Sequence, residues 1–242
     1  MSGQAEVTST DLKTHAELPV ASVASASSPE RSAHLSDPVE RLLWTLMAEF
    51  ERPALERYTT CAPTLATAEK QRFLARLASL GLDERALAAS ELAAPAKNLL
   101  AHAPSEGEVP VLIVQGLVLE HLGQAVYRIA RSSSRVSNAT RDLAASGLAS
   151  SLSVTAAATA RLAERVGTGD TLYPVFADIS HEVIGALDAL AEPVDRTFGE
   201  RFGLRFADVM GEFVADLIGA CTMLGMQRRK VVAQLAGASM GL

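Results

Sequence analysis

The chain has 242 residues, of which 48% are hydrophobic, and a formal net charge of −6 at pH 7. This length and apolar content suffice for a sizeable core, so the composition excludes a chain that is disordered throughout. The sequence also lacks a Lys/Arg-rich face with interleaved aromatic residues, which argues against nucleic acid as a partner.

The cysteine content and the N-terminus predict a cytoplasmic protein. The two cysteines, Cys61 and Cys221, lie far apart in sequence among apolar or small residues, and we expect both to be buried, reduced thiols. Residues 1–6 contain no basic region followed by an apolar run, so they do not resemble a signal peptide. The longest uncharged run, 143–160, is mostly Ala, Ser and Thr and is too weakly apolar to insert into a membrane.

The sequence divides into a tail and one domain. Residues 1–37 are rich in Ser, Ala, Thr and Glu and show no sustained hydrophobic period, which is typical of a disordered tail. Residues 38–242 are predicted to form a single helical-bundle domain.

The first predicted helix begins at Pro38, where Ser36 or Asp37 acts as the N-cap. Apolar residues follow at helical spacing: Val39, Leu42, Leu43, Leu46, Met47 and Phe50. Pro53 is expected to kink or end this helix, with residues 54–58 adding another turn or two.

Two shorter helices follow. Residues 67–80 form a predicted amphipathic helix that Gly81 closes as a left-handed cap. Asp83 is expected to cap the next helix, which breaks just before Pro95 and continues to about His102.

The remaining sequence predicts four longer helices, at about 110–132, 138–166, 171–192 and 203–236. No segment shows the alternating, β-branched pattern of a strand bounded by hairpin turns. The predicted fold class is therefore all-α, a helical bundle of about six to seven helices with a long C-terminal helix.

Long helices with scattered His and Glu invite a comparison of shape with ferritin-like di-iron bundles, whose metals bind to inward-facing Glu and Glu-x-x-His groups. Placing successive residues about 100° apart puts Glu120 and Gln124 opposite the apolar face of the 110–132 helix. Asp178 and His181 also lie off the apolar stripe of their helix. The sidedness of these groups argues against a metal site.

Three polar residues are candidates for a specific role because of where they fall on the predicted helices. Gln115 projects into an apolar face, where an unsatisfied amide costs about 1–3 kcal/mol. Arg228 falls on the inward stripe of the last helix; it belongs to a solvated basic cluster, a buried ion pair, or an anion- or partner-binding patch. His121 lies at the edge of the apolar arc, as a histidine bonded to a neighbouring helix or as a metal or haem ligand.

Glycines inside the helices predict close helix packing. Gly116 and Gly123 are one heptad apart on the same side, so another helix backbone is expected to run against them. The Ala-rich flanks of the 138–166 helix fit such packing, as would a helix-mediated homodimer.

The sequence contains no nucleophile elbow, phosphate loop, Cys-x-x-Cys pair or dinucleotide fingerprint. We therefore expect a non-enzymatic structural or interaction protein that self-associates or docks a protein partner through apolar and Gly/Ala-rich helix faces. The alternative is a bundle that binds an apolar small molecule or a metal cofactor, with Gln115, His121 and Tyr127 as polar contacts. A membrane-surface role for residues 228–242 is disfavoured, because three basic charges attract anionic lipid weakly.

Overall fold

The computed structural model describes residues 35–239 of the protein. Within this range the chain forms nine helices and no strand, which confirms the all-α prediction. The predicted tail lies outside the described residues except for 35–37. Asp37 caps the first helix, as one of the two predicted N-caps, and Leu35, which the sequence assigned to the tail, is buried in the core.

The first half of the fold contains α1 (Pro38–Cys61), the 3-10 turn η1 (Pro63–Leu65), α2 (Ala68–Ala78), α3 (Glu84–Ala88) and α4 (Ala93–His102). One continuous central helix then comprises α5 (Glu108–Val111), the π-helical η2 (Leu112–Leu119) and α6 (Glu120–Ser132).

The second half begins with α7 (Asn138–Arg165). A continuous segment of changing helical type follows: α8 (Leu172–Ala186), η3 (Leu187–Leu190), α9 (Ala191–Val194), η4 (Asp195–Gly199) and α10 (Glu200–Phe202). The last two helices are α11 (Phe206–Met223) and α12 (Arg228–Ser239).

Local capping sets several of these boundaries as the sequence predicted. The Asp37 carboxylate accepts a hydrogen bond of 2.8 Å from the backbone N–H of Val39, and Asp83 caps α3. Gly81 adopts a φ of +67° after α2, as expected for a left-handed cap. Pro53 lies inside α1 without ending it, because Ala54 and Tyr58 beyond it are buried in the core and anchor the last two turns.

The predicted long C-terminal helix is wrong, since a turn separates α11 from α12. Gly225 in this turn has a φ of +80°, a conformation that glycine adopts without strain. The backbone N–H of Met226 bonds back to the carbonyl of Cys221 at 3.0 Å, and the backbone N–H of Gly169 donates to the carbonyl of Leu224 at 2.8 Å. This tertiary contact with the α7–α8 loop fixes a break that helical periodicity alone does not show.

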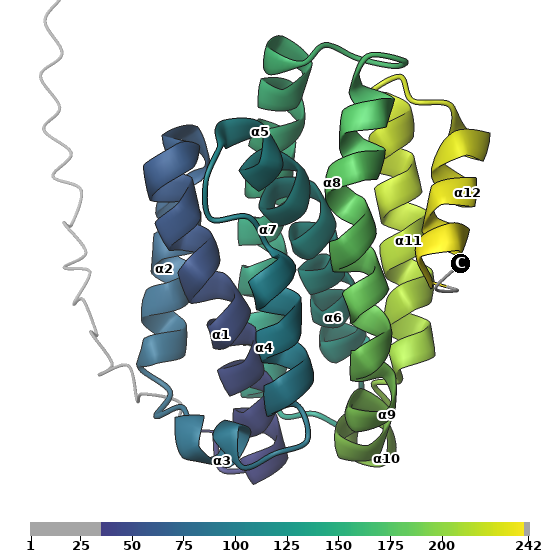
Figure 1. The fold of residues 1–242 in the computed structure, drawn as a ribbon. Helices are drawn as coiled ribbons and strands as arrows, with labels where there is room; N and C mark the ends of the chain where they lie inside the picture. Colours follow the sequence, from purple (N-terminus) through teal and green to yellow (C-terminus); the bar gives the residue numbers. More distant parts are fainter. Residues whose placement is uncertain (1–34, 240–242) are drawn as a thin grey trace, which may run out of the picture. The chain divides into compact units, whose positions relative to one another are not determined.

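The central helix 108–132 runs through the middle of the bundle (Figure 1) and packs against α7, α8 and α11. Because neighbours surround it, the face that was predicted to meet solvent is buried, and the prediction for Glu120 and Gln124 is wrong. Gln124 donates a hydrogen bond of 2.8 Å from its amide to the hydroxyl of Thr155 on α7.

A buried carboxylate joins α1 to the start of α7. Glu40 accepts hydrogen bonds from the Ser137 hydroxyl at 2.6 Å and from the Thr140 hydroxyl at 2.7 Å. The indole N–H of Trp44 completes the group by donating to Thr140 at 3.1 Å. These bonds satisfy polar groups at the beginning of the longest helix and fix its position against α1.

The close approach predicted at Gly116 is confirmed, and its neighbour is a helix of the same chain. A Cβ atom on Gly116 would lie 2.5 Å from the Cβ of Ala158 on α7, whereas at Gly123 it would make only ordinary contacts. Gly116 therefore serves packing inside the bundle, and its surface is not free for a second copy.

Two of the described helices are long and apolar enough to cross a membrane by length and composition. They are Glu108–Ser132, with a mean hydropathy of 1.5, and Asn138–Arg165, with 1.3. The buried share of the apolar window is 78% in the first helix and 50% in the second.

Candidate functional site

A buried ion cluster lies where three helices meet. Lys70 of α2 places its Nζ atom 2.6 Å from Oε1 of Glu120, at the start of α6, and also pairs with Oε2 of Glu51 from α1. The exposed fractions are 1% for Lys70, 6% for Glu51 and 5% for Glu120. The described chain thus buries three ionisable side chains, with Lys70 in contact with both carboxylates.

Two tyrosines complete the hydrogen bonding of the carboxylates. The hydroxyl of Tyr58 donates to Glu120 at 2.8 Å, and the hydroxyl of Tyr127 donates to Glu51 at 2.5 Å. Tyr127 is held in place by Trp44, which stacks on it with ring centroids 6.2 Å apart, and by Phe73, which forms a T-shaped pair with it at a centroid distance of 5.7 Å. The aromatic packing therefore orients a hydroxyl toward Glu51.

The electrostatics of the cluster follow from its burial. Burial raises the pKa of Glu51; the charge of Lys70 opposes this shift and that of Glu120 adds to it. Burial also raises the pKa of Tyr58 and Tyr127 well above the usual range, so both remain neutral donors. For Lys70, burial lowers the pKa, but the two carboxylates outweigh burial and the net shift is upward.

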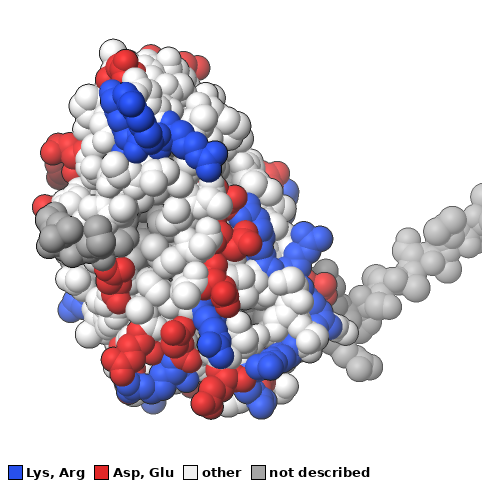
Figure 2. All heavy atoms as spheres, turned by 90° about the vertical axis from the view of Figure 1, so that its right-hand side faces the viewer, with Lys and Arg blue, Asp and Glu red and all other residues white. Residues whose placement is uncertain are grey.

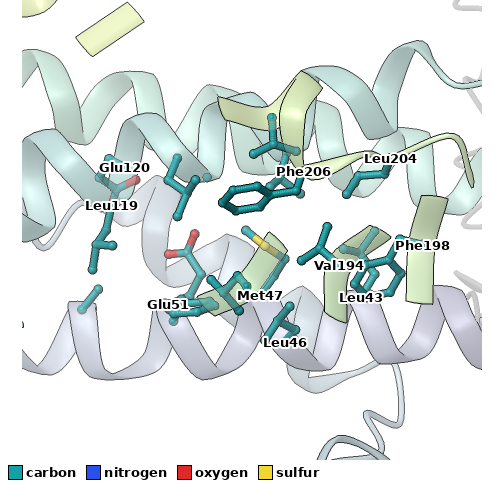
Figure 3. A pocket seen from close by; sticks show the side chains of 17 residues that line it. Leu43, Leu46, Met47, Glu51, Leu119, Glu120, Val194, Phe198, Leu204 and Phe206 are labelled. Carbon is teal, nitrogen blue, oxygen red and sulfur yellow. The ribbon is translucent and has the colours of Figure 1, made fainter. Parts of the chain in front are cut away.

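An apolar cavity of about 70 Å³ adjoins this cluster. Its walls come from α1, the central helix, the 190–198 segment and the chain around the start of α11. Figure 3 shows Glu51 and Glu120 toward one end of the lining side chains, with apolar groups continuing toward Phe198 and Leu204. Among the described residues that line the cavity, Glu51 and Glu120 are the titratable ones; Lys70 is not part of the wall.

Of the four sequence-predicted candidates, Tyr127 belongs to the ion cluster. Gln115 is buried as expected, but its amide nitrogen and oxygen have no hydrogen-bond partner within the described residues, so the expected partner is not found. Arg228 is exposed in the first turn of α12, because the break at Gly225 moves it off the predicted buried stripe. Figure 2 shows basic side chains at the top of the face that includes α12 and others in its lower half, where acidic side chains lie among them.

His121 is more deeply buried than the edge position predicted for it. Its Nδ1 atom lies 2.6 Å from the carbonyl oxygen of Leu117, one turn earlier in the same helix, and a carbonyl can only accept. The expected bond to a neighbouring helix is therefore replaced by one within the central helix. Burial lowers the pKa of His121, which favours the neutral ring.

The structure corrects the expectation that carboxylates face outward. Asp178 and His181 are exposed as predicted, but Glu40, Glu51 and Glu120 point into the fold. Across residues 35–239, no three His, Cys, Asp or Glu side chains are grouped so that they could hold a metal ion. The cation between the two carboxylates of the candidate site is the ammonium of Lys70.

The two cysteines are both free thiols. Cys221 is buried, as predicted, and burial raises its pKa to about 12, which makes it a poor nucleophile. Cys61 is only partly buried, because it occupies the last residue of α1.

Sequence analysis missed Lys70, Glu51 and Tyr58, although their spacing carried a signal. Lys70 precedes the buried Phe73 and Leu77 by three and seven residues, so it continues the apolar stripe of α2. Glu51 lies midway between Trp44 and Tyr58, seven residues from each, on the buried face of α1. Charged residues in register with large buried side chains on two helices indicated an internal ion pair.

Comparison of the chain with protein-family models and with curated proteins gives no match. The function of the site has to be inferred from its own geometry.

Proposed function

We propose that the protein binds small linear apolar molecules in the cavity beside the ion cluster. The observation that carries this proposal is a cavity of about 70 Å³ lined almost wholly by Leu, Val, Phe, Met and Ala side chains. A single water needs roughly 10–15 Å³ of such space, so the cavity is larger than a packing defect. Bundle interiors commonly supply ligand sites of this kind.

The cavity favours a slender ligand with a polar end. Its volume is too small for a large ring system, and its apolar side chains continue from Glu51 toward Phe198 and Leu204 (Figure 3), which favours a linear alkyl chain. A ligand that entered would exchange water contact for aliphatic and aromatic walls, which favours binding by about 0.8 kcal/mol for each methylene buried.

A series of linear alcohols tests this function. In NMR titrations of the full chain, affinity should rise about fourfold with each methylene from 1-butanol onward, then level off when the cavity is full. Absence of saturable binding across the series from 1-butanol to 1-octanol would contradict the proposal.

A cavity-filling variant locates the site. Gly123 lies on the cavity wall, so Gly123→Leu should weaken 1-hexanol binding at least tenfold. The matched control is Gly219→Leu on α11, where an added Cβ atom meets no atom within 4 Å and binding should be unchanged. Equal binding by both variants would place the ligand elsewhere.

A second candidate function, self-association, rests on the outer face of α7. This face carries an exposed, uncharged stripe of small residues around Leu152, whose exposed fraction is 49%: Ala145, Ala149, Leu152, Ala156 and Ala160. We propose a second copy of the chain as its occupant, because an uncharged stripe of small residues is self-complementary and allows two helix backbones to approach closely.

Light scattering after size-exclusion chromatography tests the self-association. The protein should be dimeric at high micromolar concentration, and Leu152→Glu should make it monomeric, because the charge would be buried without a partner. Val232→Glu on α12 is the control, since Val232 has a similar exposed fraction of 43% away from α7. A wild-type chain that stays monomeric would rule out self-association and leave the cavity proposal unaffected.

A further inference from the structure

The ion cluster is unbalanced in charge. Two carboxylates, Glu51 and Glu120, share the single ammonium of Lys70, and the tyrosines that bond to them are neutral donors. When both carboxylates are ionised, one negative charge remains in a buried position. Such a charge is costly unless a proton or a second cation compensates it.

The two carboxylates of the ion cluster belong to residues that border the apolar cavity. Glu51 and Glu120 belong to its wall, whereas Lys70 does not. In Figure 3 both carboxylates lie toward the left of the lining residues, and the apolar groups extend to the right as far as Phe198. The cavity is therefore amphiphilic, with acceptor oxygens toward one end and hydrocarbon toward the other.

On the basis of the proposed binding function, we infer that the ligand is a short linear primary amine. Its ammonium group pairs with Glu51, and its alkyl chain lies along the apolar wall toward Phe198 and Leu204. The ligand then supplies the second cation that the pair of carboxylates lacks within the described fold.

Glu51 can act as the partner of this ammonium. Each carboxylate has two neighbours: Glu120 Oε1 accepts from both Lys70 and Tyr58, and Glu51 accepts from Tyr127 through one oxygen and pairs with Lys70 through the other. A carboxylate can accept about four hydrogen bonds, so Glu51 retains capacity. The upward pKa shift of Glu51, caused by burial and increased by Glu120, agrees with a site that gains from a further positive charge.

Paired ligands of equal chain length separate this inference from the proposed function. In NMR titrations at pH 7, 1-hexylamine should bind the wild-type chain at least tenfold more tightly than 1-hexanol. N-hexylacetamide, which lacks the positive charge, should bind no more tightly than the alcohol. If the alcohol binds and the amine binds equally or more weakly, the inference is wrong and the cavity function stands; if none of the three binds, both are wrong.

Substitution of Glu51 tests whether its carboxylate binds the ammonium group of the ligand. Glu51→Gln keeps an oxygen that can accept from Tyr127, and it should weaken hexylamine binding at least tenfold, a larger loss than for hexanol. Glu49→Gln is the matched control, because Glu49 is on the same helix but outside the cavity wall, and it should change neither affinity. An equal loss for amine and alcohol in Glu51→Gln would assign Glu51 to the shape of the cavity and overturn the inference. Should this variant fail to fold, the comparison of the three ligands on the wild-type chain still decides.

Discussion

Replacing Lys70 with methionine should lower the free energy of unfolding by about 3–5 kcal/mol at pH 7, the largest effect we expect from a single substitution. The change removes the cation that both Glu51 and Glu120 contact and leaves two carboxylates facing each other in a buried site. Denaturant unfolding measures the loss. Lys97→Met on α4 is the matched control, because Lys97 is exposed and its substitution should change stability by less than about 0.5 kcal/mol.

The loss at Lys70 should also depend on pH in a defined direction. Lys70 opposes the upward pKa shift that burial causes at Glu51, so without the ammonium the folded-state pKa of Glu51 rises further and protonation favours the fold. A carboxyl group whose folded-state pKa is raised contributes stability that is present at low pH. This contribution is lost as the pH rises through the folded-state pKa. The deficit of Lys70→Met relative to wild type should therefore be smaller at pH 5 than at pH 7.5. An equal deficit at both pH values would show that packing, and not charge, makes Lys70 important.

Replacing Gly116 with alanine should destabilise the fold by about 1–3 kcal/mol, the second largest effect, although alanine normally favours a helix. The added Cβ would lie 2.5 Å from the Cβ of Ala158 and 3.6 Å from a methyl group of Leu65. Because its main obstacle is a Cβ fixed to the α7 backbone, two helices have to separate to accommodate it.

The neighbour of Gly116 provides an internal test of this explanation. Ala158→Gly removes the obstructing atom, so the double variant should recover part of the stability that Gly116→Ala loses. Gly219→Ala on α11 serves as control: an added Cβ there meets nothing within 4 Å, and stability should rise by about 0.5–1 kcal/mol. If Gly116→Ala is also stabilising, the contact between the central helix and α7 is looser than described.

Local sequence signals predicted the elements that local interactions determine. Asp37 and Asp83 cap helices because their carboxylates reach backbone N–H groups two or three residues later, and Gly81 ends a helix because its φ is positive. These features depend on neighbours in the chain, so a single sequence reveals them. The type and approximate limits of most helices followed from the same signals.

The candidate site could not be predicted in this way. Glu120 was assigned to a solvent-facing side because a helix with one apolar stripe normally exposes the opposite side. In the fold, Lys70 and Tyr58 from two other helices cover that side. Their separations from Glu120 are 50 and 62 residues, so no local pattern links them. Only Tyr127, among the predicted polar contacts, belongs to the cluster.

The sequence by itself determined that this protein is helical, where most of its helices begin and which residues form its aliphatic core, because hydrophobic period and capping act within a few residues. Tertiary structure alone decided that the central helix is enclosed on its polar side, that the C-terminal helix breaks at Gly225, and that Glu51, Glu120 and Lys70 meet beside a cavity. The physical reason is that burial of a charge depends on which distant groups compensate it, and the chain specifies those neighbours only by folding.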